Sequence, residues 1–413
     1  MEKINFYLDK ISLFLIIVLP IGLLISSGVS GTIEVLIIII FLINCFYKKN
    51  FSWLKNEYFL LLFLIWISLL LNLLFSQNFA LSFSRNIFFF KNIIFVFALI
   101  FFLRKEKNFN LIFKIYLIIT AIVAFDIFIE FFNKKNILGF QSTDPSRIAS
   151  FLGKELKIGH FMLGFLFIVT SYYFEKLLRR STNYKVLGFA IIIIFFVSLL
   201  LTGERANSIR AVFIALVFVI LSKKEIFMYK KIFLTAIILL SFGTYFFSEK
   251  TRYRFDVILK PIKNVGIIEA FKETQHAAHY FTAIKIFEKY PIFGVGNKNF
   301  REECLKDEYK NYDYKKTAER CATHPHQIYL ELLSEHGLIG FFTVLAVIFI
   351  ILFKSFKIYS KSKNMIHLAS ILFILSQFLP LIPSGSFFTA WGSTIFWLNF
   401  AILIFYNSKK YSK

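Results

Sequence analysis

The sequence predicts an all-α membrane protein of about twelve transmembrane helices, with a large external loop between the ninth and the tenth. Hydrophobic residues make up 57% of the 413 residues, and the mean hydropathy is +0.67. Apolar runs of about 17–25 residues recur along the chain, and this is the length that crosses a bilayer. Because lipid cannot hydrogen-bond to the backbone, runs of this kind must be helical.

The apolar runs give the expected spans in order. They cover roughly residues 11–28, 31–47, 57–75, 86–103, 110–132, 158–174, 185–201, 208–222, 230–247, 338–353, 365–382 and 388–406. Three regions follow: residues 1–247 with nine spans and a smaller loop near 133–157, residues 248–337 as the large loop, and residues 338–413 with three spans.

The net charge of +23 would suit a nucleic-acid partner, but its distribution argues against one. The basic residues cluster in alternate gaps between the apolar runs, as in Lys48 and Lys49, Lys223 and Lys224, or Lys361 and Lys363. Gaps rich in lysine and arginine face the cytoplasm in membrane proteins. Both termini and these gaps are therefore expected inside, and the two long loops outside. No cleavable signal peptide is evident near the first run.

The cysteines agree with this orientation. Cys304 and Cys321 lie in the large loop, whereas Cys45 lies in the second span. On an oxidising face the two loop cysteines can form a disulfide, worth about 3 kcal/mol in the chain-entropy model. The alternative is two free thiols. No CxxC pair suggests zinc or redox chemistry.

A histidine motif ends the large loop, in the sequence CATHPHQIYLELLSEHGLIGF at 321–341. Pro325 suits the first turn of a helix, which places His326 within that turn. The positive helix terminus disfavours imidazolium, so we expect a neutral His326 that can act as a general base. The alternatives are an interfacial histidine and half of a metal site formed with His324. No further ligand stands at a convincing spacing, so no metal is expected.

Two arginines flank a predicted span end in LTGERANSIRAVF. Arg205 lies at the outer mouth of the seventh span, and Arg210 enters the eighth. A guanidinium matches phosphate oxygens, but Arg205 can also reach the interface or pair with Glu204. Other outward charges are individually weaker signals: Arg85, Lys91, Arg147, Lys154 and Glu155. Asp126 and Glu130, one turn apart in the fifth span, can pair with such cations or line a polar cavity.

Three segments together resemble the O-antigen ligase and O-antigen polymerase superfamily of bacterial envelope enzymes, over roughly residues 190–345. The first is THPHQIYLELLSEHGLIGF, similar to the family signature at His326, Leu330, Glu335, Gly337 and Gly340. The second is LTGERA, through Gly203 and Arg205. The third is HAAHYFTAIKIFEKYPIFGVGNKNF, through Ala283, Pro291, Gly294 and Gly296.

The sequence departs from the family pattern at three positions. Gln327 replaces an asparagine and keeps an amide. His276 stands where the family has an arginine, and Tyr280 where it has a tryptophan. A titratable group thus replaces a fixed charge, which Arg252 or Arg254 can supply instead.

The resemblance implies metal-independent, inverting glycan transfer at the periplasmic face of the bacterial inner membrane, without a cofactor. The expected donor is a glycan on undecaprenyl diphosphate, and the acceptor is lipid A–core for a ligase or another lipid-linked unit for a polymerase. His326 would deprotonate the acceptor hydroxyl, and Arg205 would stabilise the leaving diphosphate. His324 would position either His326 or the acceptor. Substrate binding is expected from His276, Arg210, Arg147, Tyr280 and Glu335.

Two other classes of protein remain as alternatives. A transporter or flippase would need charges in mid-membrane helices or a repeat between the two halves, and no clear repeat is present. A structural scaffold would not need Arg205 at a span end. We therefore favour a ligase, closely followed by a polymerase.

Overall fold

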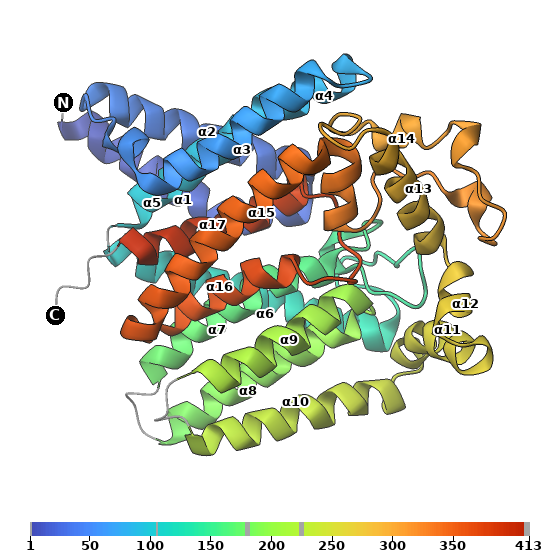
Figure 1. Ribbon diagram of the computed structural model, residues 1–413. Coiled ribbons are helices and arrows are strands. Elements are labelled where there is room, and N and C mark those ends of the chain that lie inside the picture. The colour runs from blue at the N-terminus through green and yellow to red at the C-terminus, as the bar shows by residue number, and fades with distance from the viewer. Residues whose placement is uncertain (1, 105, 178–181, 223–226, 409–413) are drawn as a thin grey trace.

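The computed structural model describes residues 2–104, 106–177, 182–222 and 227–408. Within these ranges the secondary structure is helical and contains no strand. Figure 1 shows long helices running side by side, with the short helices α11–α14 gathered at one end of the bundle. Helix α1 begins and α17 ends at the opposite end.

Each of the twelve predicted ranges falls on helical structure. These helices are α1 Glu2–Ile25, α2 Ser27–Tyr47, α3 Glu57–Leu74, α4 Phe79–Phe88, α5 Phe90–Leu103, α6 Glu106–Asn133, α7 Ile158–Leu177, α8 Thr182–Leu201, α9 Arg205–Leu221, α10 Phe227–Phe247, α15 Ile328–Ser362, α16 Met365–Gln377 and α17 Ala390–Ser408. The fourth range covers the end of α4 and all of α5.

Seven helical stretches in the described residues are long and apolar enough to cross a membrane: Tyr7–Ile25, Ser27–Tyr47, Glu57–Leu74, Phe79–Leu103, Asn108–Asn133, Ile158–Lys176 and Ile328–Ser362. Three further apolar helices are shorter, at Leu187–Leu201, Leu234–Phe247 and Met365–Gln377. The chain is thus an all-helical, multi-pass membrane protein. The count of twelve spans stays a prediction, as does the face to which the large loop belongs. The basic clusters at 178–181 and 223–226 lie outside the described residues.

The large loop is folded. It contains α11 Glu249–Val265, α12 Ile267–Lys272, α13 Gln275–Lys289 and α14 Phe300–Glu303, followed by two single 3-10 turns. Thr274 caps α13 by accepting a hydrogen bond from the Ala277 amide at 3.1 Å. A small apolar core of its own includes Ala283, Ile286 and Phe300.

Helix α15 joins this loop to the bundle and bends sharply at Gly337, whose φ is 61°. The bend brings residues 334–339 against the turn at 291–296. The Leu338 amide donates to the Pro291 carbonyl at 2.8 Å, and the Val295 amide donates to the Ser334 carbonyl at 3.0 Å. These backbone bonds attach the folded loop directly to the start of the membrane helix (Figure 1).

Two predicted helix boundaries are wrong. The helix expected from Pro325 begins at Ile328, because Gln327 caps it and accepts from the Leu330 amide at 2.8 Å. The span expected to reach residue 382 ends at Gln377. Pro380 and Pro383 have no amide to continue that helix, and Leu381 has a φ of 64°. An irregular segment, residues 378–389, therefore precedes α17.

Candidate functional site

A cavity of about 530 Å³ lies where the folded loop meets the bundle. Five separate stretches of the chain line it: the loop 147–157, the start of α7 at His160, the start of α9, the histidine motif, and residues 377–396. Of the residues predicted from the sequence, Arg147, Arg210, His324 and His326 line this cavity. The fold thus brings together side chains that are up to 179 positions apart, from Arg147 to His326.

Four histidine side chains form a cluster beside the cavity. The ring of His326 lies 4.2 Å from that of His324, 5.3 Å from that of His279 and 5.8 Å from that of His276, measured between ring centroids. His276 and His279 come from α13, and the other two from the segment before α15. Nδ1 of His276 and of His279 are buried without a hydrogen-bond partner in the described structure.

His326 is not in the first helical turn, as the sequence suggested, but two residues before α15. Its φ is 60°, and its carbonyl accepts a hydrogen bond from the Ser384 amide at 2.9 Å. A non-glycine residue in the left-handed region is uncommon and is found frequently at functional sites. The unusual backbone turns the imidazole toward the other histidines instead of along the helix.

The predicted neutrality of His326 has a different cause from the one expected. Burial, followed by repulsion from the other three histidines, lowers its pKa to about 3. Burial likewise lowers the pKa of His324 to about 4. Its Nδ1 lies 3.0 Å from the Thr323 hydroxyl, and its Nε2 lies 3.3 Å from the Ser384 carbonyl. His324 is therefore fixed on both nitrogens, whereas His326 is positioned by its backbone.

Three arginines form a cationic group next to the histidines: Arg147, Arg205 and Arg254. Arg205 donates to the Arg254 carbonyl at 2.8 Å, and Arg254 lies 3.7 Å from Asp144. Burial, then repulsion from Arg147, lowers the pKa of Arg254. Nε of Arg147 and Nε of Arg254 are buried without a partner among the described residues. We call these three residues the first cationic group.

The first cationic group acts on the histidines through His276. After burial and repulsion from His279, repulsion from Arg205 lowers the pKa of His276. Arg205 does not pair with Glu204, which instead accepts hydrogen bonds from the Gly159 amide and the Asn207 amide, both at 2.6 Å. The positive charge of Arg205 is therefore not neutralised by Glu204 and acts on His276.

The loop that carries Arg147 is fixed by carboxylates of α6. Glu130 accepts from the Ser150 amide at 2.6 Å, and Asp126 accepts from the Ile137 amide at 2.8 Å. These carboxylates bind backbone amides, and among the described residues neither forms an ion pair with the cations expected from the sequence. They position the loop, which in turn places Arg147 beside the cavity.

Arg210, although it lines the cavity, is largely occupied by the backbone. It donates to the Ser376 carbonyl at 3.1 Å and to the Pro383 carbonyl at 3.0 Å. It is 3% exposed and links the last turn of α16 to the irregular segment, so it shapes the cavity wall. Tyr280 lies with its ring 6.0 Å from the ring of His276, outside the cavity lining.

Glu335, expected to bind substrate, lies away from the cavity. Its carboxylate accepts the backbone amides of Lys298 at 2.9 Å and Phe300 at 3.1 Å, and it is 1% exposed. In this structure its carboxylate organises the turn after α13. At this position of the motif the structure shows a contact with the backbone, whereas the role of His326 as a base stays a prediction.

Sequence reasoning missed His279 and the whole segment from 378 to 396. His279 follows His276 by three residues in HAAH, so helical spacing alone puts both on one face. The segment 378–396 gave no such signal, because its apolar residues resemble a membrane span. It contributes Ser384, Trp391 and Ser393 to the cavity.

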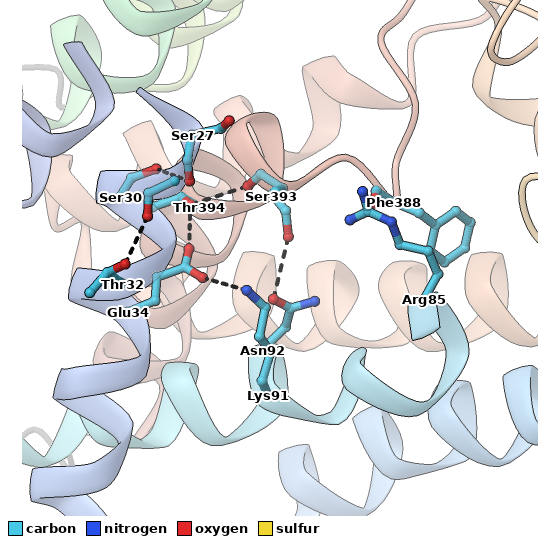
Figure 2. Close-up of polar contacts among 12 residues, drawn as sticks. Ser27, Ser30, Thr32, Glu34, Arg85, Lys91, Asn92, Phe388, Ser393 and Thr394 are labelled. Atoms are coloured by element: carbon cyan, nitrogen blue, oxygen red, sulfur yellow. Dashed lines mark hydrogen bonds and ion pairs between the residues drawn. The ribbon is translucent and has the colours of Figure 1, made fainter. Parts of the chain in front are cut away.

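A polar network connects the end of the segment 378–396 to the N-terminal helices, as Figure 2 shows. Lys91 of α5 lies 3.0 Å from Glu34 of α2, and the Thr394 hydroxyl donates to the same carboxylate. Next to it, the Ser393 hydroxyl lies 3.5 Å from Asn92 Oδ1. The start of α17 is thereby tied to the N-terminal helices.

Cys304 and Cys321 form a disulfide in the structure, with Cα atoms 5.4 Å apart. It closes the stretch between α14 and the histidine motif. We expect a cross-linked peptide by mass spectrometry without reductant, and a loss of about 3 kcal/mol of loop stability when both become serine. Cys45, buried and free, is the internal control and should react only after unfolding. Two alkylated thiols at 304 and 321 in native protein would contradict this prediction.

Comparison with known families gives a match that covers part of the site. Residues 189–345 match the model of a family described as O-antigen ligase. The match includes the histidine motif, α13 and Arg205, and it excludes Arg147 and the segment 378–396. A search of curated proteins finds no match. Among the described residues, no group of three or more histidine, cysteine, aspartate or glutamate side chains is arranged to hold a metal ion.

Proposed function

We propose that the chain transfers a glycan from undecaprenyl diphosphate to a lipid A–core acceptor, and the match of residues 189–345 to a family described as O-antigen ligase supports this. The reaction would take place at the periplasmic face of the inner membrane. One observation carries the proposal: a half-buried histidine with a lowered pKa, His326, lines a cavity together with Arg147, whose Nε has no hydrogen-bond partner among the described residues. Such a pair of features suits the removal of a proton and the departure of a diphosphate.

The proposed step is a single displacement. His326 accepts the proton of the acceptor hydroxyl, whose oxygen attacks the anomeric carbon of the donor sugar. The bond between that carbon and the diphosphate oxygen breaks, and the electron pair leaves with the diphosphate. Attack from the face opposite the leaving group inverts the anomeric centre. The first cationic group stabilises the added negative charge.

The charge of the donor also prepares the base. A histidine with a pKa near 3 accepts protons poorly at neutral pH, since the best general base has a pKa near the working pH. A bound diphosphate would raise the pKa of the nearby imidazoles by attraction. His326 would therefore become an effective base only after the donor is in place.

A second, apolar cavity suits the lipid part of the donor. It has a volume of about 380 Å³ and lies between α9, α10 and α11, lined by Ile209, Phe242, Phe255 and Leu259 among others. Ser208 and Ile209 line this cavity, whereas Asn207 and Arg210 line the polar one, so the same turn of α9 borders both cavities. A polyprenyl chain there would leave its diphosphate near Arg205.

The test is transfer by purified full-length protein in nanodiscs, given an undecaprenyl-diphosphate-linked glycan. One reaction contains lipid A–core, and another contains only further lipid-linked units. Product on lipid A–core supports a ligase, whereas longer lipid-linked chains alone support polymerisation, which uses the same chemistry. The absence of both products with protein of native melting behaviour would contradict the proposal.

Donor affinity should depend on pH through His276. Burial, His279 and Arg205 lower its pKa in the free protein, so it is mainly neutral at pH 7. If the bound diphosphate raises that pKa, binding takes up a proton and strengthens as the pH falls from 8 to 6. His276→Arg should keep tight binding and make donor affinity nearly independent of pH, and His276→Ala should weaken binding and flatten its pH dependence. Equal donor affinity for wild type and His276→Ala throughout would remove His276 from the donor site.

A further inference from the structure

A second group of cations lies on another side of the histidine motif: Arg85 of α4, Lys298 of the turn after α13, and Arg301 of α14. We call it the second cationic group. Arg301 Nη2 is 3.3 Å from the Thr323 carbonyl, and the Thr323 hydroxyl contacts His324 at 3.0 Å. Arg85 Nη1 is 3.3 Å from the Phe388 carbonyl, in the segment that forms the cavity wall (Figure 2). The group therefore borders the active site without lining its cavity.

These cations lie together, and among the described residues none of the three makes an ion pair. Nε of Arg301 is buried without a hydrogen-bond partner. Burial, and then repulsion from Arg85 and Arg301, lowers the pKa of Lys298, while attraction by Glu335 opposes this. The neighbouring carboxylates have other partners: Glu302 binds Asn78 and Glu303 binds Lys306. The Glu335 carboxylate accepts the backbone amides of Lys298 and Phe300, so it only partly offsets the positive charge.

The fold keeps the cations together by a network of amides and hydroxyls. Asn299 accepts a hydrogen bond from the Asn78 amide at 2.8 Å and donates one to the Ser82 hydroxyl at 2.7 Å. Asn297 Nδ2 donates to Asn86 Oδ1 at 2.9 Å. These bonds join α4 to the turn that carries Lys298, so Arg85 and Lys298 cannot separate easily.

The backbone of Lys298 is also held in an unfavourable conformation. Its φ is 66°, in the left-handed region that a lysine seldom adopts, and the Glu335 carboxylate fixes its amide at 2.9 Å. Bringing like charges together and holding one of them in an unfavourable conformation both cost free energy. An anion bound among the three side chains would offset that cost, and two arginine forks match phosphate oxygens.

We propose that the second cationic group binds a phosphate group of the acceptor and so places the acceptor hydroxyl at His326. This inference rests on the proposed function for its acceptor. It assigns the two cationic groups to different substrates: the first to the donor diphosphate through Arg205 and His276, the second to the acceptor through Arg301 and Thr323. The clustered histidines would then lie between the donor diphosphate and the acceptor phosphate, where the transferred proton must pass.

The test measures binding and needs no turnover. Full-length protein in phosphatidylcholine nanodiscs is titrated with bisphosphorylated lipid A, with the same lipid after removal of its phosphates, and with phosphatidylglycerol. We expect Lys298→Gln and Arg301→Gln each to weaken the binding of bisphosphorylated lipid A about tenfold, the size of one lost charged hydrogen bond. Arg301→Lys should show an intermediate loss, because it keeps the charge and loses the fork.

The controls separate the possible outcomes. Lys285→Gln removes an exposed lysine of the same folded loop, one that pairs with Glu288 at 2.6 Å, and should leave binding unchanged. The phosphate-free lipid should bind wild type and variants alike. Equal sensitivity of phosphatidylglycerol to the variants would show a site for phospholipid headgroups and overturn the acceptor role. Phosphate-independent binding would overturn the anion site itself.

The same titration in His326→Ala protein distinguishes this proposal from the proposed function. Phosphate-dependent binding that survives in that variant, and disappears in Arg301→Gln, supports the anion site even if no transfer is ever detected. Transfer to lipid A–core that is insensitive to Arg301→Gln would support the proposed function and reject the acceptor site.

Discussion

Replacing His326 with alanine is expected to slow glycan transfer by about 10²–10⁴-fold, the usual contribution of a general base. The ring lies within 6 Å of three other histidines but beside an open cavity, so its loss removes little packing. Expression and melting temperature should therefore stay near those of wild type. The measurement is the initial rate of transfer in nanodiscs at saturating donor and acceptor.

His324→Ala is the matched comparison, because that ring is the nearest neighbour of His326. Its hydrogen bonds to Thr323 and Ser384 make it a positioning residue, so a smaller loss of rate is expected. A rate for His326→Ala within a factor of two of wild type would remove this residue from the mechanism. Equal losses for both variants would instead show that the two imidazoles act as one unit.

Gly337→Ala should have the largest effect on folding of any substitution discussed here. A Cβ atom at this position would lie 2.6 Å from the Gly294 nitrogen and closer still to the Ile292 carbonyl. These are backbone atoms in bonded turns, and they cannot move aside. The left-handed conformation costs an alanine about 1–3 kcal/mol, and overpacking adds about 1–3 kcal/mol. We expect a clear fall in apparent melting temperature, or failure to recover folded protein.

Gly243→Ala is the control for that substitution. Gly243 lies within α10, and a Cβ there would meet no atom within 4 Å. Alanine favours a helix over glycine by up to about 1 kcal/mol, so this variant should be as stable as wild type or slightly more stable. Equal melting temperatures for the two alanine variants would show that the contact between 291–296 and 334–339 does not hold the loop in place.

The helices were predictable because a bilayer imposes a local requirement. An apolar stretch such as residues 31–47 must be helical, and no distant contact changes that. The same rule gave a wrong boundary at residues 365–382, which were expected to form one continuous span. The sequence FLPLIPSGSF reads as the end of a span, although two prolines stop the helix. Arg210 binds one carbonyl in the last turn of α16 and one in the irregular segment. A buried arginine bound to backbone carbonyls that are distant in the sequence leaves no local pattern.

The candidate site was predictable only where chemistry and motif coincide. His326 and Arg205 were singled out because an imidazole and a guanidinium suggest base and phosphate chemistry by their types, and these roles stay predictions. Glu335 was expected to bind substrate from the resemblance, whereas in the structure its carboxylate accepts the amides of Lys298 and Phe300. The second cationic group was invisible, because Arg85 lies more than 200 positions from Lys298 and Arg301.

The cavity wall that comes last in the chain has a consequence for biosynthesis. A membrane protein inserts its helices as they leave the ribosome, and the first cationic group and all four clustered histidines would then be in place while the segment 378–396 was still being made. Ser384, which bonds to both His324 and His326, and Trp391 would complete the enclosure only after the arginines and histidines have been synthesised. A chain arrested before this point would display arginines and imidazoles without the wall that orders them. Truncation ahead of residue 384 should therefore yield an inserted but inactive protein, so that activity must wait for the synthesis of this segment.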